Sequence, residues 1–286
     1  MVYLEIPQMS EHPIEKGVAD VVRTYELLDR VRTRQDLVIR DDQFDFTALL
    51  AAARYADRRH IRLSLLDTGR FGLEEVESLA RAGARILTSD EARPRADEWE
   101  ILQTACRDAG THLSVFWNGP LPAEDQGAGF STQTLDDLLR SGMDFHISDR
   151  TYPRDTAALA GLAAAAKRGR AFFVIYRIGP LVAELSAPAA CRAWIHFSDV
   201  AIMDEPGGIL AVDIARAAAG AGSRAVIHVE RGLPLELLEA LWTAGAALLF
   251  QTPPSDDRSL LRPIERKTAR RKLPARAYRL STAFMP

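Results

Sequence analysis

Three histidines occupy equivalent positions in short apolar segments of the second half of the chain. His146 and His196 each lie two residues before the serine of a Ser-Asp pair, and His228 precedes Glu230 by two residues. Alternate side chains of a strand share a face, so these imidazoles would point to one side, away from the large apolar residues. An imidazole beside a carboxylate suits acid/base catalysis. We predict as catalytic residues His146, His196, His228 and Glu230.

The spacing of the histidines leaves three uses open: a catalytic zinc, iron or manganese ion, a polar ligand site without metal, or hydrogen-bonded packing positions. Neither HxH nor HExxH occurs in the chain. The metal therefore stays unknown at this point, and a His/carboxylate metal site remains open.

Other polar side chains lie where the predicted strands end. Ligands of parallel α/β proteins bind outside the carboxyl ends of the strands, where the loops vary and helix N-termini point at the ligand. We predict as substrate-binding residues Asp67, Asp90, Asn118, Asp149, Arg177 and Asp199.

Several common chemistries are excluded by what the chain lacks. It contains no G-x-S-x-G, P-loop or G-x-G-x-x-G motif. Its lysines all lie outside the predicted strands, which argues against a barrel aldolase with a strand-borne Schiff-base lysine. These lysines are Lys16, Lys167, Lys267 and Lys272.

The elements that must position these residues are short β-branched and aromatic runs that alternate with helical patterns, which is typical of βαβ units. A repeat of two strands and two helices recurs, with glycine turns after one strand and glycine-containing helix caps before the next. These predicted caps are Ala82-Gly-Ala84, Ser141-Gly-Met143 and Ala244-Gly-Ala246. The predicted strands are Val2–Ile6, Leu37–Arg40, Ile61–Asp67, Arg85–Asp90, His112–Asn118, Phe145–Asp149, Phe172–Arg177, Trp194–Asp199, Ala225–Glu230 and Leu248–Thr252.

This alternation predicts an α/β fold: a parallel (βα) barrel, TIM-like, of eight to ten strands built from paired βαβα repeats. We expect one barrel domain over residues 1–257 and a basic C-terminal tail over residues 258–286. The tail carries nine Lys/Arg and one acid, a charge of +8, whereas the whole chain of 286 residues carries −3. It is a candidate docking segment for an acidic partner or nucleic acid, or a solvated arm that folds back on the acidic body.

Localisation and cofactors follow from further absences. The N-terminus has no basic region followed by an apolar run, and the apolar stretch 156–166 is too short to span a membrane, so we expect a cytoplasmic protein. The two cysteines, Cys106 and Cys191, are far apart and form no metal-binding pair, so no iron–sulfur cluster is expected. With a pI near 6.1, nucleic acid is not the expected partner.

A family resemblance covers residues 36 to about 118. Residues 37–46 (LVIRDDQFDF), 61–71 (IRLSLLDTGRF) and 81–90 (RAGARILTSD) resemble, in order, the strands of radical-SAM barrels that end in Gly-Gly-Glu-Pro, Thr-Asn-Gly and Ser-Leu-Asp. Residues 3–7 (YLEIP) would then be the strand before the cluster loop. The family's CxxxCxxC motif is missing between Gln8 and Asp20, and Gly-Gly-Glu-Pro is replaced. The resemblance therefore implies a degenerate member without radical chemistry.

Two functional hypotheses follow. The first is a non-catalytic, radical-SAM-like accessory subunit that binds a peptide, a cofactor precursor or a partner protein, with the basic tail as a docking element. It predicts a filled or solvent-poor interior and an exposed apolar patch or an unpaired sheet edge. The second is a TIM-barrel enzyme that acts on a small polar substrate, with or without metal, through the strand-end His and Asp/Glu residues. It predicts that the three imidazoles lie within hydrogen-bond or metal reach of one open pocket.

Overall fold

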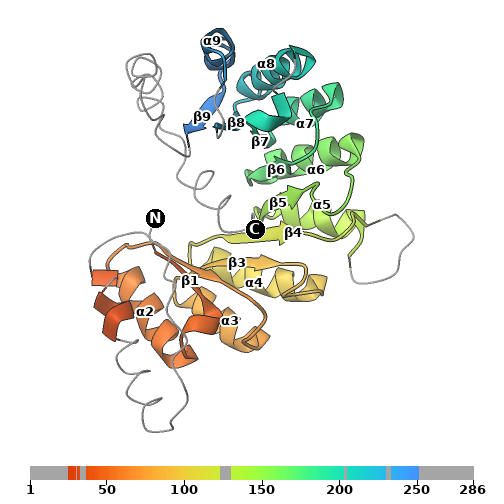
Figure 1. Cartoon of the computed structure of the whole chain (residues 1–286). Helices are drawn as coiled ribbons and strands as arrows, with labels where there is room; N and C mark the ends of the chain where they lie inside the picture. The colour runs from red at the N-terminus through yellow and green to blue at the C-terminus, as the bar shows by residue number, and fades with distance from the viewer. Residues whose placement is uncertain are drawn as a thin grey trace. The chain divides into compact units, whose positions relative to one another are not determined.

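The fold is α/β, with strands and helices that alternate along the chain (Figure 1). The computed structural model describes residues 25–29, 31–32, 37–122, 130–202, 205–229 and 233–250. The strands in these ranges form a parallel sheet in which neighbours follow chain order. They are β1 (Leu37–Arg40), β2 (Leu63–Leu66), β3 (Arg85–Ser89), β4 (Leu113–Trp117), β5 (Asp144–Ser148), β6 (Phe173–Arg177), β7 (Trp194–Ser198), β8 (Ala225–Val229) and β9 (Ala247–Phe250).

Each strand after β1 is preceded by a helix or a helical turn. The helices are α2 (Phe46–Arg58), α3 (Leu73–Arg81), α4 (Ala96–Asp108), α5 (Thr132–Arg140), α6 (Thr156–Gly169), α7 (Ser186–Ala190), α8 (Glu205–Gly220) and α9 (Leu235–Thr243), with 3-10 turns η1 (Asp41–Gln43), η2 (Ala183–Leu185) and η3 (Asp199–Ile202). The predicted parallel α/β architecture is confirmed, and the predicted strand bounds agree to within two residues. The predicted strand Val2–Ile6 lies outside the described residues.

The described residues divide into two compact units. Unit 1 runs to Phe116 and includes Phe130; unit 2 contains residues 117–122 and runs on from Ser131. Each unit is described by itself below. None of the described helices has the length and hydropathy that are needed to span a membrane.

Every helix from α2 to α9 ends in the same kind of cap, which explains the repeat in the sequence. In α3 the backbone N–H of Ala84 donates to the carbonyl of Leu79 at 3.1 Å, with Gly83 at φ +94° between them. This left-handed turn satisfies the last carbonyls of the helix and directs the chain into the next strand. The caps that the sequence predicted at Gly83, Gly142 and Gly245 are confirmed, since each has positive φ.

In unit 2 the helices lie on one side of the strands. Right-handed crossovers between strands that follow chain order place every connecting helix on the same face, and Figure 1 shows α5, α6 and α7 along one side of β5 to β7. The opposite face, which we call the inner face, carries no helix of the described residues. Strand registers place on it His146, Val174, Tyr176, Trp194, His196, Val226, His228, Ala247 and Leu249.

Candidate functional site

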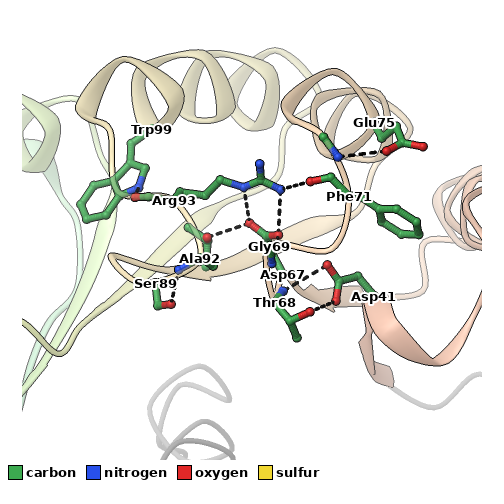
Figure 2. A network of polar contacts seen from close by, with 12 residues as sticks. Asp41, Asp67, Thr68, Gly69, Phe71, Glu75, Ser89, Ala92, Arg93 and Trp99 are labelled. Atoms are coloured by element: carbon green, nitrogen blue, oxygen red, sulfur yellow. Dashed lines mark hydrogen bonds and ion pairs between the residues drawn. The ribbon is translucent and has the colours of Figure 1, made fainter. Parts of the chain in front are cut away.

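A buried network of acids and one arginine links the strand ends of unit 1 (Figure 2). The Asp67 carboxylate, directly after β2, accepts two hydrogen bonds from Arg93, through Nε at 2.9 Å and Nη2 at 3.0 Å. It also accepts from Thr88 Oγ1 at 2.7 Å and from the Gly69 N–H at 3.1 Å. Four donors therefore engage the carboxylate that the sequence predicted to bind substrate.

Arg93 is held from the other side as well. Its Nη2 donates to the Phe71 carbonyl at 2.6 Å, and its own carbonyl accepts from Trp99 Nε1 at 2.9 Å. Gly69 closes the turn with φ +83°, and a Cβ there would lie 3.2 Å from the Ala92 carbonyl oxygen. The network fixes the loops after β2 and β3 against each other. The sequence analysis missed Arg93, which lies three residues after Asp90 in the loop that follows β3.

Asp41 is a second buried acid of unit 1 and was also missed. Its carboxylate accepts from Thr68 Oγ1 at 2.6 Å and from the Thr68 N–H at 3.1 Å. Burial raises the pKa of this carboxyl group, and the nearby charge of Asp67 acts in the same direction, against the hydrogen bonds from Thr68. Asp41 therefore holds its proton more tightly than an exposed aspartate does.

The predicted substrate-binding residues fall into both units. Asp67 and Asp90 belong to unit 1, where Asp90 is half-buried and its N–H donates to the Phe116 carbonyl at 3.3 Å. The other four predicted residues belong to unit 2 and are Asn118, Asp149, Arg177 and Asp199. The three histidines belong to the same unit. That these residues bind substrate stays a prediction.

Charged groups at the strand ends of unit 2 engage one another and the backbone. The Asp149 carboxylate accepts from Arg177 Nη1 at 2.5 Å and from the Ile178 N–H at 2.7 Å. Arg177 Nε donates to the Pro180 carbonyl at 2.8 Å. Arg154 reaches back to the preceding loop, where Nη1 donates to the Gly119 carbonyl at 2.6 Å.

Asn118 and Asp199 occupy different environments at this edge. The Asn118 side chain is exposed, and its carbonyl accepts from Arg154 Nη2 at 3.4 Å. Asp199 is fully buried at the start of η3 and accepts from Ser198 Oγ at 3.2 Å.

The three histidines lie in one row with Tyr176 across β5 to β8. His146 Nδ1 is hydrogen-bonded to Tyr176 Oη at 3.1 Å, and His196 Nδ1 to His228 Nε2 at 3.2 Å. The rings of Tyr176 and His196 are in contact between these pairs, with centroids 5.0 Å apart. Only 0–5% of each of the four residues is exposed. Tyr176, which the sequence analysis missed, thus separates His146 from the other two.

His196, His228 and Tyr176 are uncharged at pH 7. Burial lowers the pKa of His196 well below its usual value, and the neighbouring His228 and His146 lower it further. Burial also lowers the pKa of His228 and raises that of Tyr176. Neutral imidazoles and a phenol donate and accept hydrogen bonds without a net charge.

One nitrogen of the row lacks a hydrogen bond. Within the part of the chain that the structure describes, His196 Nε2 is buried and has no partner. Its Nδ1 is already engaged with His228. Buried polar atoms are nearly always paired, so this atom marks a place where another molecule could bind.

The arrangement differs from a metal centre in the described residues. Among these residues, no three His, Cys, Asp or Glu side chains are grouped so that they could hold a metal ion. His196 and His228 contact each other directly, whereas metal ligands would face a common ion. Glu230, the predicted acidic partner of His228, lies outside the described residues.

Comparisons with known proteins identify no family. No family model matches the chain, and no curated protein matches it. Among solved structures, a putative fructose-1,6-biphosphate aldolase from Coccidioides immitis is 15% identical, with 79% of this chain and 77% of that chain covered and a TM-score of 0.34. Deoxyribose phosphate aldolase from Aeropyrum pernix is 15% identical, with 80% and 95% covered and a TM-score of 0.29.

A third similar structure is D-threonine aldolase from Filomicrobium marinum, which is 11% identical, with 80% of this chain and 59% of that chain covered and a TM-score of 0.23. Scores and identities this low carry no argument about function. None of the comparisons supports the resemblance to radical-SAM barrels, which stays a prediction; its expected cluster loop lies outside the described residues.

Proposed function

We propose that the chain is an enzyme that binds a small, uncharged polar substrate at the inner face of unit 2 and transfers a proton through His196 and His228. The observation that carries the proposal is the state of His196. Its ring is fully buried, Nδ1 is paired with His228 at 3.2 Å, and Nε2 has no partner in the described part of the chain. A bound hydroxyl or carbonyl group would satisfy this nitrogen.

The two tautomers of the pair support complementary roles. If His196 Nδ1–H donates to His228, then His196 Nε2 is an acceptor and can remove a proton from the substrate. If His228 Nε2–H donates to His196, then His196 Nε2 carries a hydrogen and can polarise a substrate oxygen. Because burial keeps both rings neutral near pH 7, either tautomer is available at that pH.

Tyr176 and His146 would orient the pair. The Tyr176 ring packs against His196, and its hydroxyl is fixed by His146 at 3.1 Å. A positioned imidazole is more effective in proton transfer than a mobile one, because the reacting atoms are already within hydrogen-bond distance.

The accessory-subunit hypothesis remains the alternative. The burial of the row agrees with the solvent-poor interior that this hypothesis predicts. We prefer the enzyme hypothesis because His196 and His228 are hydrogen-bonded to each other and His196 Nε2 has no partner in the described residues. The basic segment 258–286 lies outside the described residues, so a protein partner for it stays a prediction.

Nuclear magnetic resonance of protein with ¹⁵N-labelled imidazoles tests the binding step. We expect acetone and ethanol to shift the His196 signals, and acetate and methylammonium at the same concentrations to leave them unchanged. His196→Phe should abolish binding, whereas His60→Asn, at an exposed histidine of unit 1, should not. Uncharged probes that leave the His196 signals unchanged would contradict the proposal.

The proton-transfer step has its own readout. In D₂O the protein should speed the exchange of the carbon-bound protons of dihydroxyacetone for deuterium, and His196→Phe should slow this exchange. Binding without any exchange would reduce the proposal to a binding function, as the accessory hypothesis has it.

A further inference from the structure

Three large apolar side chains are exposed on successive segments at the carboxyl end of the strands in unit 2. Tyr152 follows β5 and is 41% exposed, Ile178 follows β6 directly and is 49% exposed, and Val200 follows β7 and is 45% exposed. They make up half of the exposed large hydrophobic residues in the described part of the chain. Exposed apolar side chains that gather at one place mark a binding surface more often than singly scattered ones do.

These three segments are neighbours, because the strands before them end level with one another. The register pairs Ser148 with Tyr176, and Arg177 with Phe197 on the next strand. Adjacent strands lie about 4.8 Å apart, so the starts of the segments after β5 and β7 are separated by roughly 10 Å. One small molecule can reach across this distance.

The apolar segments lie directly above the histidine row. Ile178 follows Tyr176 by two residues, and His146 and His196 each lie two residues before the end of their strands. At about 3.3 Å per residue, the row is roughly 3–7 Å below the carboxyl edge of the strands. Ile178 and Val200 are thus the exposed apolar residues that directly follow the two strands carrying Tyr176 and His196.

The charged groups here do not call for an ionic ligand. Asp149 and Arg177 form an ion pair, and Arg177 also donates to the Pro180 carbonyl. Arg154 donates hydrogen bonds to the carbonyls of Ser148 and Gly119. These three charged side chains are therefore engaged within the protein, next to the exposed apolar side chains of Ile178 and Val200.

We propose that the substrate is an uncharged amphipathic molecule, with a hydroxyl or carbonyl group on His196 Nε2 and a hydrocarbon portion packed on Ile178 and Val200. This inference rests on the proposed function, and it adds the class of the substrate. Tyr152, after β5, is not part of this contact, because the Arg154 guanidinium lies over its ring, with Cζ 5.8 Å from the centroid.

A homologous series of 1-alkanols, from ethanol to 1-hexanol, tests the inference. A hydroxyl group both donates and accepts, so it suits either tautomer of His196. In titrations followed by the imidazole signals of His196 and His228, we expect Kd to fall about two- to fourfold for each added methylene, as the burial of hydrocarbon predicts.

Variants distinguish the contribution of Ile178 and Val200 to alcohol binding from that of His196. Ile178→Ser combined with Val200→Ser should remove most of the dependence on chain length and leave the affinity for ethanol unchanged. Ile101→Ser, at an exposed position on α4 in unit 1, should keep the full dependence. A third variant, His196→Phe, should remove the response to all the alcohols.

Each failure has a different meaning. If ethanol binds but longer alcohols bind no tighter, or if the double serine variant keeps the dependence on length, the amphipathic substrate class is wrong and the proposed function stands. If no alcohol alters the imidazole signals, both the inference and the proposed function are wrong.

Discussion

Asp67 and Arg93 form an ion pair with two parallel hydrogen bonds, in which the side chains are only 0% and 6% exposed. The pair joins the loops after β2 and β3 in unit 1 (Figure 2). Taking both charges out of water costs free energy, so the intact pair adds little to the stability of the fold. Removal of one partner destabilises the fold strongly, because the other charge stays buried without a counter-charge.

Replacement of Arg93 by methionine should lower the free energy of unfolding by about 3–5 kcal/mol, because it leaves the buried Asp67 carboxylate without a counter-charge. Urea unfolding measures the change. Arg95→Met is the matched control, since Arg95 pairs with Asp97 at the surface and its loss should leave stability unchanged. The double change Asp67→Leu and Arg93→Met should recover more than half of the loss; equal effects of Arg93→Met and Arg95→Met would contradict this account.

Asp41→Asn should stabilise the protein at neutral pH. The folded state raises the pKa of Asp41, so its ionisation costs stability as pH rises through about 4 towards the raised pKa. The variant has no such ionisation, and its advantage over the wild type should therefore appear across this range and remain constant above it. Thermal unfolding between pH 3 and 8 measures the difference.

The neighbouring Asp42 is the control of opposite sign for this experiment. A hydrogen bond from Arg40 lowers the pKa of Asp42 against the effect of burial, so its ionised form stabilises the fold. Asp42→Asn should lose stability relative to the wild type as pH rises above the lowered pKa. The account of Asp41 is wrong if both variants change stability in the same direction.

The buried histidines should make the protein less stable in mild acid. His196 and His228 have lowered pKa values in the folded state, so below about pH 6.5 the unfolded chain takes up protons that the folded protein does not. Each histidine then contributes a slope of at most about 1.4 kcal/mol per pH unit, with stability rising towards higher pH. Chemical unfolding between pH 5.5 and 7.5 measures the slope.

Variants assign this slope to the row. His196→Phe should reduce the slope by about half, since one of the two histidines no longer titrates in the unfolded state alone. His60→Asn should leave it unchanged, because His60 is exposed. An unaltered slope in His196→Phe would show that other groups cause the pH dependence.

Two glycines of α6 should respond in opposite ways to alanine. A Cβ at Gly161 would meet no atom within 4 Å, so Gly161→Ala should stabilise the helix by about 0.5–1 kcal/mol. A Cβ at Gly169 would lie 2.0 Å from the Leu139 carbonyl oxygen, so Gly169→Ala must push α6 away from the end of α5. We expect a loss of about 1–3 kcal/mol, measured by urea unfolding. Two variants of equal stability would contradict the packing at Gly169.

The elements of the fold could be predicted because their signals are local. The bounds of β1 follow from four residues, and the caps at Gly83, Gly142 and Gly245 from the need for a left-handed residue after a helix. Strand alternation likewise predicted that His146 and His196 share a face. Each of these inferences needs only the residues within one strand or one turn.

The hydrogen bonds and ion pairs of the site join residues that are far apart in the chain, and the sequence did not predict these contacts. Thirty residues separate His146 from Tyr176, and the hydrogen bond between them exists only because β5 and β6 pair in one register. The same holds for Arg93, which neutralises Asp67 across 26 residues. A local pattern contains no information about register, which is set by the packing of whole strands and helices.

The sequence by itself determined an alternating parallel α/β fold and the face on which the histidines lie, because alternation and capping are properties of the chain over a few residues. Only the tertiary structure decided that Tyr176 separates His146 from the His196–His228 pair and that His196 Nε2 lacks a partner in the described residues. It also decided that Asp67 is engaged by four donors. The physical reason is that burial and hydrogen-bond partners arise from strand register and side-chain packing across the sheet.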